Sequence, residues 1–443
     1  MDLPFLPPLW QDLAAGLASC LHQRHAWRLA VLLLGALFAK GRRTVTSWLR
    51  AAHVGRGFAA YYYFLAALGR HTDWLAGLLL RRALAVLAPD GPLLFAVDDS
   101  PTKRYGPHVQ GAGVHHNPTP GPTDQKFLYG HVWVTLAWVV THPLWGAIGL
   151  PLRASLYVRA KDVPRVPGRQ GWSFHTKLEL AAALVRWAAG WCRFAGRAVR
   201  AVADGAYAKR PFLKAAAAAG VTVISRLRRD AGLRTLPVPP RGRRRRGRPR
   251  TYGAGRISLA KRAGQKRGWR VVHARQYGEA REKRVKTFLA TWRPAGGAIR
   301  VVIVREDRGW LALFSTDVSL TAEDILSSAA DRFSIEQDFH DLKEVEGLGQ
   351  QQVRDIWANV GAFHVSAWVH TLVELWAWGQ PREAICDRSE SPWDDPERRP
   401  SHADRRKALQ RQCLGQEFQQ LAQGQAVTEE IQQFVGRVIN HAA

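Results

Sequence analysis

The chain has 443 residues, with 64 Lys and Arg against 36 Asp and Glu, which gives a formal net charge of +28. A hydrophobic content of 47% that includes 18 Trp excludes a disordered chain and allows a large core in two or three domains. The excess positive charge indicates a polyanionic partner, most simply nucleic acid. An anionic membrane surface fits less well, because the charge is spread along the chain and not concentrated on one amphipathic helix.

Neither the cysteines nor the apolar runs indicate secretion or membrane insertion. The four cysteines are widely separated and form no C-x-x-C pair, as expected for free thiols in a reducing compartment. The apolar run 29–39 is about 11 residues long, too short to span a bilayer, and no small-residue cleavage site follows it. We therefore expect a cytoplasmic, nucleoid-associated protein that does not bind membranes.

Residues 1–88 are predicted to form a basic, helical, DNA-binding domain. Their patterning indicates helices over 29–39, 44–53, 57–68 and 73–87, separated by Gly and by the sequence His-Thr-Asp. Seven arginines lie in or between these helices, at positions 42, 43, 50, 56, 70, 81 and 82. The alternative is a helical cap whose arginines are only solvated.

Residues 89–230 alternate strands and helices, which predicts a mixed α/β domain. The expected strands are 93–99, 127–140, 145–159, 197–204 and 221–226, and the expected helices are 176–194 and 211–219. Two of these strands close on carboxylates, Asp98-Asp99 and Asp204. Residues just past strand ends gather at one edge of an open α/β sheet, so these aspartates are site candidates. The alternative for each is a turn or helix-capping residue.

Residues 231–320 are predicted to be a basic linker followed by a β insertion. The segment 237–250 is too rich in Pro, Gly and Arg to build a core. Its Arg246-Gly247-Arg248-Pro249 sequence has the form of a minor-groove hook, although non-specific phosphate contact or a solvated linker would give the same composition. Four antiparallel strands are then expected, over 269–276, 285–292, 299–305 and 310–315.

Residues 321–379 contain the stretch Ala330–Lys343, which is expected to lie in one helix over about 321–346. At 100° per residue, Arg332, Glu336 and Lys343 share one face, flanked by apolar side chains that point to the core. Ser334, Gln337, Asp338 and Asp341 are expected on the opposite, polar face. The stripe is either a buried ion network or a metal-binding glutamate with cations for phosphates. Glu336 is the preferred carboxylate, with Glu346 as its rival. Residues 380–443 are expected to be a linker and a helical or mobile tail.

The order Asp99, Asp204, Glu336 resembles the DDE transposases of bacterial insertion sequences, in particular the branch with a β insertion before the Glu. That branch has a Tyr-x2-Arg-x3-Glu-x6-Lys signature, which Arg332, Glu336 and Lys343 match, whereas Ala329 stands at the Tyr position. The segments 97–103, 202–207 and 347–354 are similar to the family's other conserved segments. In the first of them the carboxylate directly before Ser or Thr is expected to be catalytic, which favours Asp99 over Asp98.

The resemblance implies an RNase H-like mixed sheet that is interrupted by the β insertion, preceded by the helical domain and followed by C-terminal helices. It also implies two Mg²⁺ ions, or Mn²⁺ in their place, held by Asp99, Asp204 and Glu336. Arg332 and Lys343 would contact phosphates beside the scissile bond, and Arg246 and Arg248 would contact DNA elsewhere. The partners are double-stranded DNA, at transposon ends and target, and by analogy a second copy of the chain on paired ends. A catalytically silent DNA-binding derivative and a structure-specific nuclease are the alternatives.

Overall fold

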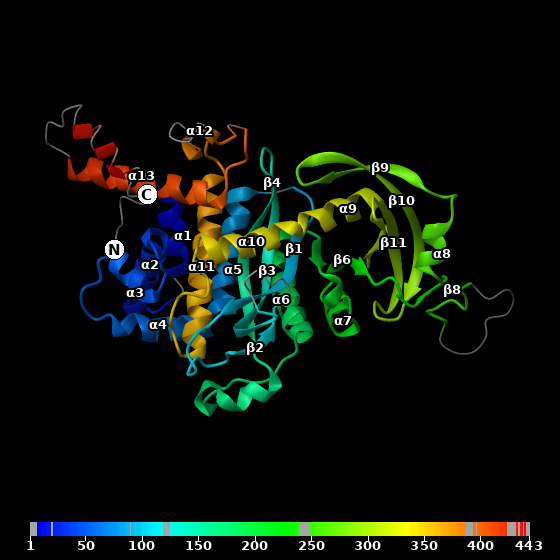
Figure 1. Cartoon of the computed structure of the whole chain (residues 1–443), viewed down its shortest axis with the longest axis horizontal. Coiled ribbons are helices and arrows are strands. Elements are labelled where there is room, and N and C mark those ends of the chain that lie inside the picture. Colours follow the sequence, from blue (N-terminus) through cyan, green and yellow to red (C-terminus); the bar gives the residue numbers. More distant parts are fainter. Residues whose placement is uncertain are drawn as a thin grey trace.

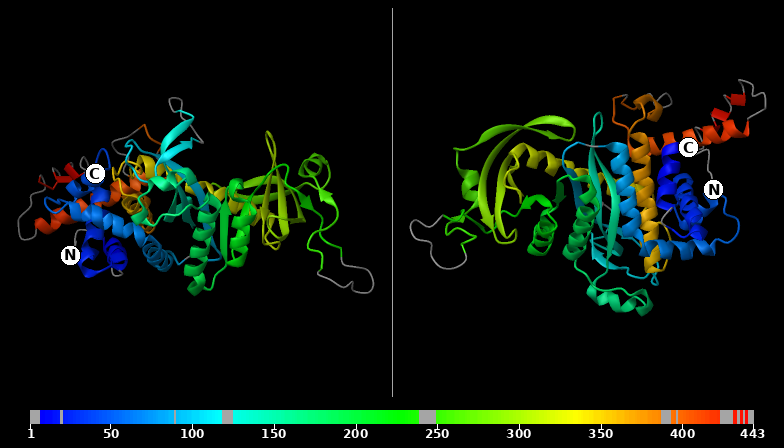
Figure 2. Two further views of the ribbon diagram at one scale, coloured as in Figure 1. Left: turned by 90° about the horizontal axis from the view of Figure 1, so that it is seen from below. Right: turned by 180° about the vertical axis from the view of Figure 1, so that it is seen from behind.

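The computed structural model describes residues 7–18, 21–88, 90–117, 125–238, 249–386, 393–395 and 397–422, and a few residues between 431 and 439. The two expected DNA contacts Arg246 and Arg248 lie outside these residues. Among the described residues, no helix is both long and apolar enough to cross a bilayer. The molecule is elongated, with a helical bundle at one end, a mixed sheet in the middle and a β-rich unit at the other end (Figures 1 and 2).

The N-terminal region is helical, with α1 (Pro8–Ala18), α2 (Gln23–Phe38), α3 (Val45–Ala51), α4 (Ala59–Arg70) and α5 (Thr72–Leu87). It packs directly on the long buried helix α11 (Ile356–Ala377). Helices α4 and α11 cross at two glycines that allow their backbones to touch. A Cβ atom on Gly69 would lie 2.0 Å from the carbonyl oxygen of Trp357, and one on Gly361 would lie 2.1 Å from that of Leu65.

The central sheet carries the order of an RNase H-like fold. Strands β1 (Leu93–Lys103), β3 (Phe127–His142) and β4 (Gly146–Tyr157) pair antiparallel, whereas β5 (Val199–Ala203) and β6 (Thr222–Leu227) run parallel to β1. The resulting order is β4-β3-β1-β5-β6, with the short β2 (Gly113–His116) beside the start of β3. The predicted mixed α/β fold is confirmed.

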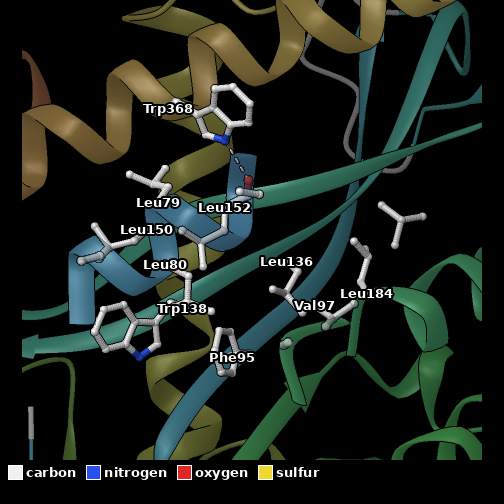
Figure 3. Close-up of a cluster of buried hydrophobic side chains, with 14 of the residues drawn as sticks. Leu79, Leu80, Phe95, Val97, Leu136, Trp138, Leu150, Leu152, Leu184 and Trp368 are labelled. Carbon is white, nitrogen blue, oxygen red and sulfur yellow. Dashed lines mark hydrogen bonds between the residues drawn. The ribbon is translucent and has the colours of Figure 1, made fainter. Parts of the chain in front are cut away.

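Alternate residues of β1 enter two separate cores. Phe95 and Val97 pack on one face against α6 (Lys177–Cys192), α5 and α11, in the core drawn in Figure 3. In that core the indole N–H of Trp368 donates to the carbonyl oxygen of Leu152 at 2.9 Å. Ala96 belongs to the core of the other face, which α9 (Ala322–Asp331) and α10 (Phe333–Glu344) cover. Neighbouring residues of β1 therefore meet different helices, as the two-residue period of a strand requires.

The β insertion follows β6 and extends the same sheet. It contains β7 (Leu233–Arg234), β8 (Arg256–Ile257), α8 (Leu259–Gly264), β9 (Arg270–Gln276), β10 (Glu279–Trp292), β11 (Gly297–Glu306) and β12 (Gly309–Ser315). Strand β12 pairs antiparallel with β6, so the insertion is continuous with the central sheet. The four strands predicted before the Glu helix correspond to β9–β12. Short 3-10 helices lie at η1 (Ala160–Arg165), η2 (Gly168–Gln170), η3 (Arg193–Ala195) and η4 (Gly205–Tyr207), and α7 (Arg210–Ala218) precedes β6.

The expected single helix over 321–346 is two helices that meet at Arg332. Thr321 caps α9 as predicted, in a capping box with Asp324. The expected orientation of α10 was wrong: Asp338 and Asp341 are buried, whereas Glu336 is exposed. The polar face is covered because β4, α11 and the segment after it pack there; Asp338 lies against Gly149, where even a Cβ atom would collide with its carboxylate. The chain continues through α11 and α12 (Arg382–Ile385) to α13 (His402–Leu421).

Candidate active site

Strands β1 and β5 bring two aspartates to the same place on the sheet. The two strands are parallel and Val97 is in register with Ala203, so Asp98 and Asp204 are the next residue on each. Asp204 directly follows β5 and is the N-cap residue of η4, where its carboxylate accepts a hydrogen bond from the Ala206 N–H at 3.2 Å. This local bond orients the Asp204 side chain just past the end of β5.

Arg332 joins the Glu helix to the first of these aspartates. Its Nη1 lies 2.7 Å from Oδ2 of Asp98, and its Nη2 lies 2.5 Å from Oε1 of Glu336. Arg332 and Glu336 are four residues apart and therefore neighbours on a helical surface. The guanidinium thus holds two carboxylates that are 238 positions apart in the sequence (336 − 98) around one positive centre.

Asp99 points to the opposite face of the sheet, which corrects the expectation that it joins Arg332 and Glu336. Its Oδ2 lies 2.6 Å from Nζ of Lys177, in the first turn of α6, and its Oδ1 accepts a hydrogen bond from the Tyr207 hydroxyl at 2.6 Å. The physical reason is the alternation of β1, which places Asp98 with Ala96 on the α10 side and Asp99 with Val97 on the α6 side.

Carboxylates crowd this edge of the sheet. Burial raises the pKa of Asp98 to about 6; Arg332 opposes the shift, whereas the carboxylates of Asp99 and Asp204 add to it. Burial is also the main cause that raises the pKa of Tyr207, and the negative charges of Asp99, Asp98 and Asp204 raise it further. The three aspartates therefore act on one another electrostatically, and a cation placed among them would relieve the repulsion.

The donor set fits a hard divalent cation. Asp98, Asp204 and Glu336 offer only carboxylate oxygens, which Mg²⁺ and Mn²⁺ prefer. Asp204 and Glu336 are exposed, so a metal could keep several waters there. Arg332 already supplies a positive charge between Asp98 and Glu336, which offsets part of the repulsion among the carboxylates.

The remaining predicted residues are less closely tied to this centre. Lys343 is half-buried, and burial lowers the pKa of its ammonium group; it lies about 10 Å along the helix from Glu336. Glu346, the rival carboxylate, is buried next to His402 and Arg406, away from the aspartates. Sequence reasoning missed Lys177 and Tyr207. Only the position of Tyr207, three residues after Asp204, could have suggested it.

Comparison with known proteins agrees with this geometry. The sequence model of a family described as DDE superfamily endonuclease matches residues 16–294, well over half of the chain. No curated protein matches it significantly. The matched range includes Asp98, Asp99 and Asp204 and ends before α9, so Glu336 lies outside it. On the strength of the family match, the chain belongs to the DDE superfamily of endonucleases.

Proposed function

We propose that the protein is a transposase that binds the ends of its insertion sequence and catalyses Mg²⁺-dependent strand cleavage and strand transfer. Membership of an endonuclease family supports cutting of DNA phosphodiesters. The observation that carries the proposal is the bridge from Asp98 through Arg332 to Glu336, beside the strand end that bears Asp204.

In this proposal Asp98, Asp204 and Glu336 hold the metal ions, and Asp98 takes the place that the sequence had given to Asp99. Bound Mg²⁺ ions would stabilise the charge that develops on the attacking and leaving oxygens. Arg332 would exchange one or both of its hydrogen bonds to Asp98 and Glu336 for hydrogen bonds to a phosphate beside the scissile bond. A guanidinium binds carboxylate and phosphate with the same planar geometry. Lys343, further along the same helix, would contact the next phosphates.

Asp99 has a supporting role in this scheme. By accepting from the Tyr207 hydroxyl it fixes the last residue of η4, whose first turn is capped by Asp204. The ion pair with Lys177 fixes the start of α6 in the same way. Asp99 is therefore a positioning residue: it orients the loop that carries Asp204 without facing the metal side itself.

The protein surface supports a DNA partner at both ends of the molecule. Exposed arginines lie on the N-terminal helices and their connections, at Arg42, Arg50, Arg56, Arg70, Arg81 and Arg82. Others lie on the β insertion, at Arg267, Arg270, Arg275, Arg281 and Arg284. Phosphate contacts from such residues make binding strongly salt-dependent. We further propose that two copies of the chain act on paired ends, which size-exclusion chromatography with light scattering on end DNA would test.

The test is a cleavage assay on a plasmid that carries the inverted repeats flanking the gene. Wild-type protein with Mg²⁺ should cut at the repeats and join the 3′ ends to target DNA. Glu336→Gln should lose cleavage by at least about 10³-fold while its affinity for end DNA changes less than about threefold. Glu323→Gln, which removes a carboxylate from the first turn of α9, is the matched control and should remain active.

Two outcomes would replace the proposal. Cutting without preference for the repeats and without joining would show a structure-specific nuclease. Sequence-specific binding by a wild-type protein that never cuts, with Mg²⁺ or Mn²⁺, would show a silent DNA-binding derivative.

A further inference from the structure

A wide pocket lies in the β insertion, on the face of the sheet opposite the catalytic aspartates. It is bounded by α8, by Trp269 just before β9 and by the ends of β10, β11 and β12, at the β-rich end of the molecule (Figure 1). Its volume is about 620 Å³, within the range of ligand-binding pockets. Asp98, Asp204 and Glu336 do not line it, so it is a separate site.

Strand alternation determines which side chains enter the pocket. Val285 of β10 and Val304 of β11 are partners in the sheet and belong to the core under α9 and α10. The next residue on each strand, Arg284 and Arg305, therefore points to the opposite face. There Arg305 is the partner of Trp310 on β12, whose indole packs against the other core. The pocket and the catalytic side of β1 thus lie on opposite faces of one continuous sheet.

Two arginines meet in this pocket without a counter-charge. Arg284 and Arg305 are neighbours across the β10–β11 ladder, and their side chains make no hydrogen bond or ion pair with any residue that the structure describes. Lys266 lines the pocket as a third cation. Of the two carboxylates at the pocket, Glu306 is already paired with a lysine of β10 at 2.9 Å, which leaves Asp307. Like charges at paired strand positions repel each other, so a phosphate bound between the two guanidinium groups would stabilise them.

Two tryptophans form part of the pocket wall, and each ring is held in a fixed orientation. The indole N–H of Trp269 donates to the carbonyl oxygen of Gln265 at 3.1 Å, and the ammonium group of Lys286 lies over the ring, 4.8 Å from its centroid. The guanidinium group of Arg229 lies over the ring of Trp310, 5.2 Å from its centroid. Side chains that are ordered before a ligand arrives lose little entropy when a planar group stacks on them.

We propose that this pocket binds one unpaired nucleotide of a DNA strand, with its base on the tryptophans and its phosphate between Arg284 and Arg305. A base inside a duplex has both faces covered by its neighbours, whereas an unpaired base offers a free face for stacking. Aromatic rings beside a positively charged groove are the combination by which many proteins hold single strands. This binding requires only that the protein acts on DNA, as its endonuclease family indicates, and is independent of strand transfer.

The test measures the affinity of the full-length protein, in EDTA so that no cutting occurs, for two labelled oligonucleotides of equal length. One is oligothymidylate and the other is the same sugar-phosphate backbone without bases, so the difference in affinity reports base stacking. By fluorescence anisotropy the wild type should bind oligothymidylate at least about tenfold more tightly. Glu336→Gln should behave like the wild type, which separates this result from the cleavage assay.

Trp310→Leu keeps an apolar side chain against the core but removes the stacking surface. We expect it to fold, as judged by circular dichroism, and its preference for oligothymidylate to fall below about threefold. Arg305→Gln should reduce the slope of log affinity against log salt concentration by about 0.7, the value for one phosphate of a single strand. The matched control is Arg308→Gln, which neutralises an exposed arginine outside the pocket and should change neither value.

A second measurement does not depend on the folding of any variant. 5-Iodouracil placed in the oligonucleotide should crosslink under ultraviolet light to Trp269 or Trp310, as located by mass spectrometry. The proposal is overturned if crosslinks form only outside the pocket, or if folded Trp310→Leu keeps the wild-type preference. It is also overturned if free thymidine monophosphate binds as tightly as the oligonucleotide, which would indicate a site for a free nucleotide. Equal loss of duplex and single-strand affinity in Trp310→Leu would likewise contradict it.

Discussion

The substitution Asp98→Asn distinguishes the role of Asp98 from that of its neighbour Asp99. It removes the one carboxylate charge that faces both Arg332 and the metal side of the sheet. The pKa of Asp98 is raised from 3.8 to about 6, mainly by burial. A carboxyl whose pKa is higher in the folded than in the unfolded state binds its proton more tightly when folded. Its contribution to stability is therefore complete below about pH 3.8, falls as the pH rises, and is lost above about pH 6.

The size of this effect follows from the shift. A difference of about 2.2 pKa units corresponds to about 3 kcal/mol at 1.36 kcal/mol per unit, which the metal-free wild type loses at pH 8. Asn is neutral and of the same shape, so it avoids most of that loss. We expect Asp98→Asn to raise the free energy of unfolding by about 1.5–3 kcal/mol at pH 8 in EDTA, and by much less at pH 4.

Urea denaturation of both proteins in EDTA and in Mg²⁺ is the assay, alongside DNA cleavage. Mg²⁺ should stabilise the wild type, by about 2.7 kcal/mol at a hundred times its Kd, and should leave the variant unchanged. Cleavage should fall by at least about 10³-fold. The reasoning would be refuted if Asp98→Asn cut DNA normally, or if it were less stable than the wild type in EDTA at pH 8. Retained stabilisation of the variant by Mg²⁺ would equally contradict it.

Further predictions concern positioning and packing. Asp99→Asn removes the negative charge that pairs with Lys177, and Tyr207→Phe removes the hydroxyl that donates to Asp99. Each should lower kcat about tenfold, or about 1.4 kcal/mol, while the affinity for end DNA and the Mg²⁺ stabilisation remain. If Asp99→Asn lost the affinity for end DNA and the Mg²⁺ stabilisation to an equal extent, Asp99 would be assigned to the metal centre. Gly69→Ala places a methyl group 2.0 Å from the Trp357 carbonyl oxygen and should destabilise the protein by more than about 3 kcal/mol in urea. The exposed α6 substitution Gly190→Ala meets no atom within 4 Å and should be stabilising by about 0.5–1 kcal/mol, and similar effects at the two sites would refute the packing argument.

The sequence was sufficient for features that depend on local pattern. Strand periodicity and turn residues located β1 and β5 and the four strands of the insertion, and the Thr321 cap located the start of α9. The expected end of β1 at Asp99 was wrong, because pairing with β3 carries the strand on to Lys103. The spacing of Arg332 and Glu336 placed them on one helical face, where side chains four residues apart are neighbours, and the structure shows them in contact. These features need no knowledge of what packs on them.

Only the tertiary structure decided which faces are buried and which aspartate meets the glutamate. Asp338 and Asp341 form a polar stripe in the sequence, yet β4 and α11 cover them. The pattern of residues within α10 does not indicate which other elements pack against it. Asp98 and Asp99 are chemically equal as neighbours on a strand. Strand alternation directs the two side chains to opposite faces of the sheet. Because α10 packs on one face and α6 on the other, Asp98 contacts Arg332 and Asp99 contacts Tyr207.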